Sequence, residues 1–315
     1  MTIAWVVGSS GLLGSALHRA LHSTGAILFT PAERFRWDSE PELTVQLEAA
    51  VKAFAAFVGA EKKWQIYWAA GVGTMSSTEA ELAVETQTLS LLLSLVESEP
   101  GLIAAKGCFA FASSAGAIYA GATDDIISEN TPVAPTTAYA HEKLKQENLV
   151  SSFALNNCKV TALLARISTL YGPGQANGKQ QGLITQIARR ILRNQPIQIY
   201  VPLDTIRDYI IADDAAAATV VALRALSEKL GVFTKIIASE QPTTIAEIIS
   251  IYKRIARRIP GIVTSANKLS CIYTRRVQFH SIAVPNNEQI SSTILLLGIA
   301  QVMAAERSAF IRSSR

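Results

Sequence analysis

The sequence contains few residues of the kinds that form disulfide frameworks or metal centres. Its three cysteines, Cys108, Cys158 and Cys271, are odd in number and widely spaced, which fits neither a disulfide framework nor a zinc site. We expect buried, reduced thiols. The four histidines form no metal-binding constellation: His18 and His22 are four residues apart, but no carboxylate partner is near in sequence. The sequence therefore predicts no bound metal.

Charge of one sign is not concentrated anywhere in the chain. The 315 residues include 29 Lys and Arg against 25 Asp and Glu, a formal net charge of +4, without a long run of one sign. Nucleic-acid-binding proteins more often carry a basic stripe or tail, so the sequence argues against such a partner. With 49% hydrophobic and 17% charged residues, a disordered or fibrous chain is excluded.

Segments suited to crossing a membrane are missing as well. Residues 102–122 contain a single charge, at Lys106, but they are rich in Gly, Ser and Ala and divide into a strand and a loop. The first five residues lack the basic region and the cleavage site of a signal peptide. We therefore expect a cytoplasmic protein with no membrane partner.

Strand and helix patterns alternate along the first half of the chain. Residues 3–7 are a continuous apolar run ending at Gly8, which is typical of a strand buried in a parallel sheet. Helical spacing follows, and this β-α-β-α order predicts a doubly wound parallel sheet with right-handed crossovers. The expected strands cover residues 3–7, 26–30, 65–69, 108–112 and 160–166, and the expected helices cover 12–21, 41–57, 79–98 and 138–153.

Beyond Gly174 the pattern loosens, which indicates a smaller C-terminal α/β lobe over the sheet edge. The expected helices there cover residues 183–193, 214–226, 244–257 and 294–304, and the expected short strands cover 197–201 and 232–238.

Three glycines lie between the first strand and the first helix. Gly8 permits a tight turn, Gly11 lets the backbone approach a phosphate, and Gly14 lets the helix lie close to the sheet. The helix N-terminus adds free N–H groups and a partial positive charge. The alternative is a glycine-rich turn that binds nothing, but the strand–loop–helix context favours a dinucleotide site in a Rossmann sheet. The candidate cofactor contacts in this loop are Gly8, Ser10, Gly11, Leu12, Leu13 and Gly14.

The end of the second strand should distinguish NAD from NADP. An acidic residue there would hydrogen-bond the ribose hydroxyls, but none stands at the strand tip, and Glu33 comes a few residues late. Arg34 and Arg36 could face a 2′-phosphate or could simply be solvated. We expect NADP or NAD, with NADP slightly preferred. Asp38 is a candidate adenine contact, with entry into the next helix as its alternative role.

Two polar motifs predict a catalytic site. Ser113 and Ser114 follow the strand at residues 108–112, and Tyr139 and Lys143 share one face of the next helix because they are four apart. An ammonium group and a positive nicotinamide ring beside Tyr139 would favour phenolate, making it a usable acid or base. Ser114 would hydrogen-bond the same substrate oxygen, whereas Ser113 would satisfy backbone groups. The order of the motifs favours catalysis over a chance surface pair.

These motifs resemble those of the extended short-chain dehydrogenase/reductases, in the NAD-dependent epimerase/dehydratase family of nucleotide-sugar enzymes. The resemblance covers residues 3–214, and the stretches 164–174 and 207–214 are more specific to the extended branch. It implies that Tyr139 is the acid/base, that Lys143 lowers its pKa and holds the nicotinamide ribose, and that Ser114 polarises the substrate. It also implies an NAD(P)-binding domain at 1–170 plus about 205–240, and a substrate lobe at about 171–204 and 241–315.

The same resemblance implies further binding residues. Arg207 would clamp the diphosphate of a nucleotide sugar, unless it instead pairs with Asp208 or Asp213. Thr169 stands where the family commonly has Asn, so its sugar contact departs from the pattern. The implied cofactor contacts are Ala69, Ala70, Gly71, Lys143, Ile167 and Ser168, and the implied substrate contacts are Ser114, Tyr139, Thr169 and Arg207.

The acid pair that dehydratases carry after the serine strand is replaced here by residues 115–117, Ala-Gly-Ala, which disfavours water elimination. We therefore expect an NAD(P)-dependent nucleotide-sugar epimerase or reductase. The alternatives are a reductase of a smaller carbonyl compound and a non-catalytic NAD(P)-sensing regulator. The intact Ser114, Tyr139 and Lys143 argue against the regulator, and Arg207 favours a nucleotide sugar.

The family also implies a homodimer built from the helices at residues 79–98 and 138–153. The apolar stripe expected to carry it is Leu82, Thr86, Leu89, Leu93 and Val96. The alternative is that this stripe faces only its own sheet.

Overall fold

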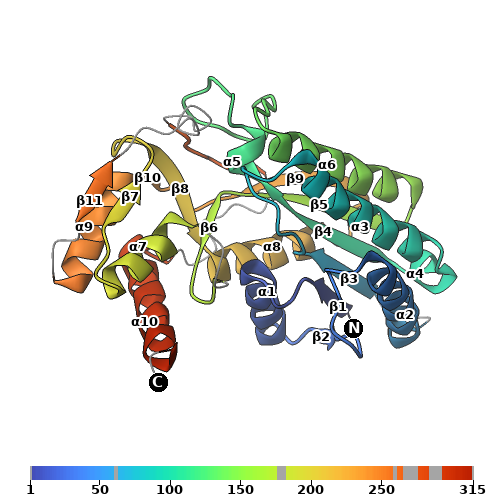
Figure 1. The fold of residues 1–315 in the computed structure, drawn as a ribbon. Helices are drawn as coiled ribbons and strands as arrows, with labels where there is room; N and C mark the ends of the chain where they lie inside the picture. Colours follow the sequence, from blue (N-terminus) through green and yellow to red (C-terminus); the bar gives the residue numbers. More distant parts are fainter. Residues whose placement is uncertain are drawn as a thin grey trace.

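A six-stranded parallel sheet forms the centre of the larger domain (Figure 1). The strand order reverses between β1 and β3, which opens a crevice at the carboxyl ends of these two strands. This arrangement confirms the expected doubly wound α/β fold. From edge to edge the strands are β2 (Ile27–Phe29), β1 (Thr2–Val7), β3 (Lys63–Trp68), β4 (Gly107–Ser114), β5 (Val160–Ile167) and β9 (Gly231–Ile237). The computed structural model describes residues 2–59, 63–175, 182–257, 261–264, 276–283 and 293–313.

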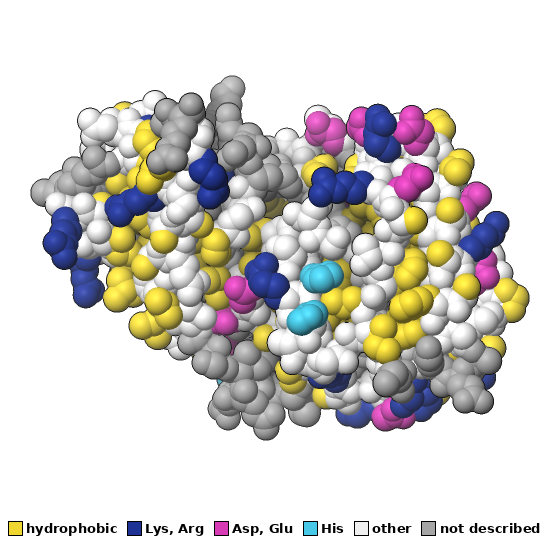
Figure 2. Space-filling model, turned by 90° about the horizontal axis from the view of Figure 1, so that it is seen from below, with side chains coloured by type: hydrophobic (Ala, Val, Ile, Leu, Met, Phe, Trp, Pro, Cys, Tyr) yellow, Lys and Arg dark blue, Asp and Glu magenta, His cyan; other side chains and the backbone are white. Residues whose placement is uncertain are grey.

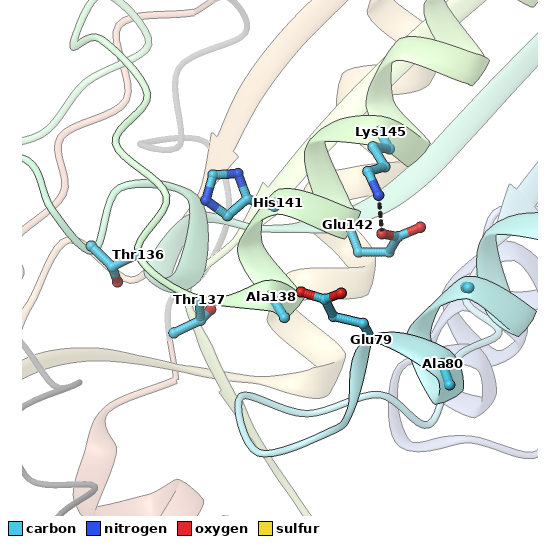
Figure 3. Close-up of a pocket in the computed structure, with 9 residues that line it drawn as sticks. Glu79, Ala80, Thr136, Thr137, Ala138, His141, Glu142 and Lys145 are labelled. Carbon is cyan, nitrogen blue, oxygen red and sulfur yellow. Dashed lines mark hydrogen bonds and ion pairs between the residues drawn. The ribbon is translucent and has the colours of Figure 1, made fainter.

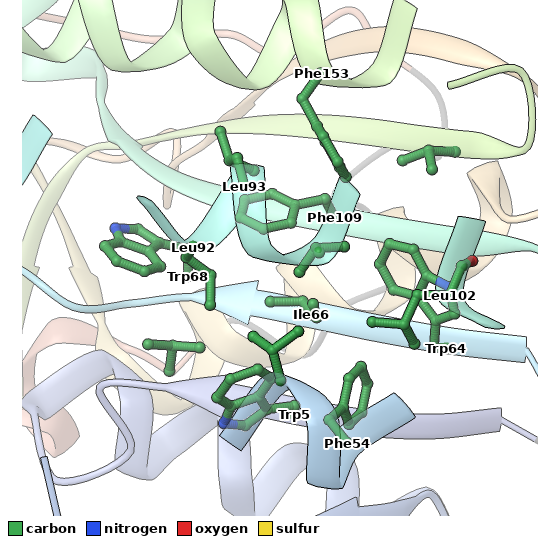
Figure 4. Close-up of a cluster of buried hydrophobic side chains, with 14 of the residues drawn as sticks. Trp5, Phe54, Trp64, Ile66, Trp68, Leu92, Leu93, Leu102, Phe109 and Phe153 are labelled. Carbon is green, nitrogen blue, oxygen red and sulfur yellow. The ribbon is translucent and has the colours of Figure 1, made fainter. Parts of the chain in front are cut away.

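Helices cover both faces of this sheet, so its strands are apolar on both sides. On one face α1 (Leu12–Ser23) and α8 (Ala212–Leu226) pack together over one core cluster. On the other face lie α2 (Glu40–Val58), α3 (Glu79–Glu97) and α6 (Ala138–Asn156), with the short α4 (Pro100–Ala104). Figure 4 shows the aromatic and aliphatic side chains that fill this second cluster: Trp5, Phe54, Trp64, Ile66, Trp68, Leu92, Leu93, Leu102, Phe109 and Phe153.

The C-terminal lobe has a core of its own. A mixed sheet of β6 (Thr169–Tyr171), β8 (Ile206–Ile211) and β10 (Pro242–Thr244) lies beside the pair β7 (Ile197–Ile199) and β11 (Ile262–Thr264). The helices of the lobe are α7 (Leu183–Leu192), α9 (Ile245–Ala256) and α10 (Leu295–Ser313).

Strand β8 belongs to both cores, because successive side chains of a strand point to opposite faces. Ile210 packs in the cluster beneath α1 and α8, whereas Tyr209 and Ile211 pack in the cluster of the lobe. The exact division of the chain into two domains stays a prediction.

The expected strands and helices of the first half are all present, but several short elements were not expected. These are α4, α5 (Ala115–Ile118), β6, β8, β10 and β11. Helix α10 continues to Ser313, nine residues beyond the predicted end at Ala304. The sequence did not predict this extension, because the last turns carry exposed polar residues that interrupt the apolar pattern.

The expectation of buried thiols holds for Cys108 but is wrong for Cys158, which is exposed in the turn that follows α6. Cys271 lies outside the described residues. Among the residues that the structure describes, no three His, Cys, Asp or Glu side chains gather where they could hold a metal ion. No described helix combines the length and the apolar character needed to cross a membrane.

The predicted stripe of α3 is occupied within the subunit: Leu89, Leu93 and Val96 lie in the core cluster over the sheet, and Thr86 accepts a hydrogen bond from Gln146 of α6 at 3.0 Å. Leu82, Leu89, Leu93 and Val96 are all buried inside the subunit. The outer surface of α3 instead presents Val84. A dimer through α3 and α6 would therefore need residues other than this stripe.

Candidate active site

In the loop at residues 8–14, which we call the glycine loop, the structure requires glycine at two of the three glycine positions. Gly8 has φ +87°, and a Cβ there would lie 2.6 Å from the backbone N of Ala70. A Cβ on Gly14 would lie 2.0 Å from the carbonyl O of Gly8. A Cβ on Gly11 would meet its nearest atom, the same carbonyl O, at 3.3 Å. Packing therefore explains Gly8 and Gly14, and leaves Gly11 as the position where an approaching ligand would need the room.

The N-terminus of α1 is open to an anion. Gly11 is its N-cap, no side chain caps it, and no acidic residue lies in the first turn. Ser9, Ser10 and Gly11 are exposed, while Leu13 anchors the helix in the core. Free N–H groups at the crevice between β1 and β3 fit the pyrophosphate of a dinucleotide.

The loop after β2 is held by polar contacts with α2. Gln46 accepts a hydrogen bond from the N–H of Arg36 at 2.8 Å and donates to the carbonyl O of Arg34 at 3.1 Å. The Arg36 guanidinium lies 3.2 Å from Asp38 and 3.4 Å from Glu42, and it holds the pKa of the Asp38 carboxyl below its usual value. Asp38, the predicted adenine contact, thus already forms an ion pair with Arg36.

Arg34 differs from Arg36 in this loop. Its side chain is exposed and makes no hydrogen bond or ion pair within the part of the chain that the structure describes. Of the two arginines at the end of β2, Arg34 is therefore the one with a free cation.

The loop after β3 contacts the glycine loop on one side and α3 on the other. Ala69 donates its N–H to the carbonyl O of Val7 at 2.9 Å, and Ala70 lies against Gly8. Glu85 of α3 accepts hydrogen bonds from the N–H groups of Val72 and Gly73, both at 2.5 Å. Sequence reasoning missed Glu85, because nothing in the pattern of α3 signals that a backbone loop lies across it.

Tyr139 is the second residue of α6, whose N-cap Thr137 accepts a hydrogen bond from the N–H of Ala140 at 3.2 Å. Its pKa is raised to about 12, because burial and the nearby charge of Glu85 disfavour phenolate, while a hydrogen bond with the Ser114 side chain opposes them. The sequence led us to expect phenolate to be favoured by Lys143. In the protein alone the balance favours the neutral phenol.

Lys143 lies one turn further along α6 and is buried. Its Nζ donates to Oε1 of Gln146 at 2.9 Å and lies 5.8 Å from the ring centroid of Tyr139. Burial lowers the pKa of Lys143, and the charges of Glu85 and Glu147 oppose that shift. The structure thus brings Ser114, Tyr139 and Lys143 together at the end of β4.

A buried ionic network lies behind these three residues. Arg166 makes a two-pronged ion pair with Glu147 at 3.0 and 2.7 Å, and it donates to the Tyr119 hydroxyl at 2.5 Å. Ser113 donates to Glu147 at 2.6 Å. Ser113 is therefore a structural residue, although its partner is a carboxylate rather than the backbone groups expected. The network fixes the ends of β4 and β5 against α6.

Ser168 and Asp208 join the two parts of the molecule. Ser168 donates its Oγ–H to Asp208 at 2.5 Å and its N–H to the carbonyl O of Ile237 at 2.9 Å. Asp208 also accepts from Ser239 and Gln241, and burial raises its pKa. The side chain of Ser168 thus has a structural partner beside the predicted nicotinamide position at Ile167.

Two of the four predicted substrate residues, Thr169 and Arg207, lie on the sheet of the lobe, whereas Ser114 and Tyr139 lie on β4 and α6 of the larger domain. Thr169 of β6 pairs with Tyr209 of β8, and Arg207 lies two residues earlier on β8. Arg207 donates to the carbonyl O of Ile206 at 2.7 Å. The ion pair of Asp213 in the structure is with Arg19 of α1.

A surface pocket lies between the starts of α3 and α6 (Figure 3). Its lining includes Glu79, Thr137, His141 and the ion pair between Glu142 and Lys145, whose atoms are 2.8 Å apart. Neither Tyr139 nor Lys143 lines it, so it is distinct from the candidate active site. His141 lines this pocket whereas Tyr139 does not, which agrees with the expectation that the two side chains leave different sides of α6.

Comparison with known proteins agrees with this geometry. Residues 4–233 match the model of the NAD dependent epimerase/dehydratase family. The chain is 30% identical over 125 residues to the dTDP-L-rhamnose 4-epimerase of Burkholderia thailandensis, covering 39% of this chain and 34% of that protein. It is 32% identical over 115 residues to a dTDP-4-dehydro-6-deoxyglucose reductase of Escherichia coli, covering 36% of each. The aligned part thus spans about a third of either relative.

The fold itself is shared over almost the whole chain. The structure of RMD from Pseudomonas aeruginosa complexed with NADPH superposes with a TM-score of 0.78 and 21% identity, covering 98% of this chain and 100% of that one. Together with the family match over residues 4–233, the glycine loop and the Ser114, Tyr139 and Lys143 cluster, this places the chain in the NAD dependent epimerase/dehydratase family, the extended short-chain dehydrogenase/reductases.

Proposed function

We propose that the protein is an NAD(P)-dependent nucleotide-sugar epimerase or reductase. The observation that carries the proposal is the cluster at the end of β4, where Ser114 ends the strand, Tyr139 and Lys143 lie one turn apart on α6, and the Lys143 Nζ is 5.8 Å from the centroid of the tyrosine ring. The relatives named above act on dTDP-linked sugars, one as an epimerase and one as a reductase. Residues 115–117, the first three of α5, include no acid, which supports these reactions over elimination.

The chain supplies proton transfer and positioning. When bound at the glycine loop, a nicotinamide cofactor would deliver hydride to, or take it from, the sugar carbon. Tyr139, neutral at pH 7 with a pKa of about 12, donates its proton to a keto oxygen during reduction and takes one back in the reverse direction. Ser114 shares the hydrogen bond to that oxygen, where negative charge develops in the transition state.

Lys143 and the lobe supply the remaining contacts. Lys143 would hold the nicotinamide ribose while its charge eases proton loss from Tyr139. Arg207 and Thr169, on adjacent strands of the lobe sheet, would meet the diphosphate and the sugar. Ala69, Ala70 and Gly71 would border the cofactor, since this loop packs against Gly8. The cytoplasmic location expected from the sequence stays a prediction.

The test offers the purified protein a panel of dTDP- and UDP-linked sugars with NADH, NADPH and their oxidised forms. Cofactor absorbance and sugar configuration are followed together. Net cofactor consumption identifies a reductase or dehydrogenase, and changed configuration without net consumption identifies an epimerase. Turnover of small aldehydes and ketones alone would favour the smaller-carbonyl reductase. Cofactor binding without turnover of any of these compounds would favour the regulator.

A further inference from the structure

Glu85 is a charged residue beside the proposed active site that the proposed function does not use. It lies in the second turn of α3 and is half-buried. Its Oε1 accepts two backbone hydrogen bonds, from the N–H groups of Val72 and Gly73. These two residues continue the loop that begins at Ala69.

The fit between α3 and this loop is close. A Cβ on Gly71 would lie 3.1 Å from Oε2 of Glu85, and a Cβ on Gly73 would lie 2.6 Å from a methyl group of Leu82. Gly71 also has φ +148°, which side chains other than glycine rarely adopt. On its other side the same loop touches Gly8 through Ala70. Glu85, the loop and the glycine turn therefore form one continuous set of contacts.

Glu85 also lies beside the catalytic helix, because the next residue, Thr86, accepts a hydrogen bond from Gln146 at 3.0 Å, and Gln146 accepts one from Lys143 at 2.9 Å. Among the described residues, the charge of Glu85 acts on both Tyr139 and Lys143, and that of Glu147 from α6 acts on Lys143. Glu147 is already paired with Arg166. Within the described residues, Glu85 bonds neutral backbone amides and lies in no ion pair. Its negative charge is thus not offset by a cation of its own; it helps to raise the pKa of Tyr139 and opposes the lowering of the pKa of Lys143 by burial.

We propose that Glu85 is a positioning residue that holds the loop at residues 70–73 against the glycine turn and presents an unpaired negative charge to Tyr139 and Lys143. This inference rests on the proposed function. It assigns the loop–helix contact a role in binding the cofactor, and it assigns the carboxylate charge a role in setting the pH at which Tyr139 exchanges its proton.

The first experiment measures cofactor affinity without turnover, by titrating the protein with NADPH and NADH and following nucleotide fluorescence. Glu85→Ala removes both hydrogen bonds from the loop, and we expect Kd to rise by about tenfold or more. Glu85→Gln keeps an acceptor oxygen, so its Kd should stay within about threefold of wild type. Glu79→Gln, which removes an exposed charge from the first turn of the same helix, should leave Kd unchanged.

The second experiment uses the pH profile of turnover, which a merely structural role would not move. Removing a negative charge beside Tyr139 lowers its pKa, so the profile limb due to this residue should move to lower pH in Glu85→Gln, by on the order of one pH unit. It should stay in place in Glu79→Gln. Because Glu85→Gln preserves size and an acceptor, it keeps the inference testable even if Glu85→Ala fails to fold.

The outcomes separate the inference from the function. If the wild-type protein binds neither NADPH nor NADH, the proposed function is wrong and the inference falls with it. If wild type binds and Glu85→Ala binds equally well, only the role in the loop is overturned. An unmoved pH limb in Glu85→Gln overturns the electrostatic role.

Discussion

Tyr139 is the residue whose replacement tests the proposed chemistry most directly. Tyr139→Phe removes the phenol oxygen but keeps the ring beside Lys143, so packing should survive. We expect turnover to fall by about 100- to 10,000-fold, the usual contribution of a general acid. The measurements are the steady-state rate on whichever sugar responds and the cofactor Kd, which should stay at the wild-type value. Tyr200→Phe changes an exposed tyrosine outside the proposed site and serves as the control. Full turnover in Tyr139→Phe would refute the mechanism.

Arg34 decides the expected preference for NADP. Its cation is free, whereas that of Arg36 is shared between Asp38 and Glu42. We expect Arg34→Ser to weaken NADPH binding by about tenfold or more, because a charge-assisted contact to the 2′-phosphate is lost, and to leave NADH binding unchanged. Parallel fluorescence titrations with both nucleotides give the ratio of the two affinities. A ratio that changes in Arg36→Ser instead would assign the phosphate to the other arginine.

The local signals in the sequence identified Ser114, Tyr139 and Lys143 as a group, because strand ends and helix spacing fix which side chains share a space. They did not identify partners that the fold brings from elsewhere. Ser168 bonds Asp208, 40 positions later, and Ser113 bonds Glu147, 34 positions later. Pairs of this kind leave no pattern in one sequence, which is why the partner of Ser113 and the structural role of Ser168 became evident only in the fold.

At the scale of elements, the turn between β1 and α1 offers a contrast between two glycines. Gly14→Ala places a methyl group 2.0 Å from a backbone oxygen, so α1 must shift from the sheet. We expect a loss of about 1–3 kcal/mol in the free energy of unfolding, together with loss of cofactor binding. Gly11→Ala has 3.3 Å of room, so its melting temperature should stay near wild type while cofactor affinity falls. Thermal melts without cofactor and nucleotide titrations measure the two effects separately. Unchanged cofactor affinity in Gly11→Ala would show that the phosphate site is not at Gly11.

The long elements of the larger domain were predictable because their strands are mostly apolar, as in the continuous run at residues 3–7, and their helices carry apolar spacing. The missed strands β6, β10 and β11 have only three residues each, and their pairing comes from distant segments, as between Thr169 and Tyr209. Such strands form only because distant segments pair with them, so no local sequence pattern predicts them. Strand β8 is not evident in the sequence, because the charged residues of the motif at 207–214 indicate a functional site more strongly than a strand.

At the scale of the whole molecule, the expected homodimer depends on the outer surface of α3 and α6. Because the stripe of α3 is buried, Val84, 53% exposed on α3, is the apolar residue best placed to test it. If two copies pack α3 and α6 together, Val84→Arg should yield a monomer by light scattering at micromolar concentration. Val45→Arg, at a position 66% exposed on α2, should leave the dimer intact. A wild-type protein that is itself monomeric would refute the dimer.

No basic stripe is visible among the described residues on the face of the molecule in Figure 2. Figure 2 shows one face, on which Lys and Arg side chains are scattered among hydrophobic and polar ones rather than gathered in a stripe. This face thus offers no broad positive field, and we expect a few placed residues, such as Arg207 and Arg34, to attract the proposed anionic ligands.

The double membership of β8 restricts how this enzyme scaffold can be recombined. Because Ile210 packs toward one core while Tyr209 and Ile211 pack toward the other, a crossover point placed on either side of this strand leaves one hydrophobic cluster with foreign side chains. A chimera that imports a new lobe to change the proposed substrate specificity would have to bring β8 and its apolar neighbours from the same parent. The strand that carries Arg207 is then inherited with the lobe that it serves, and specificity and stability cannot be exchanged separately.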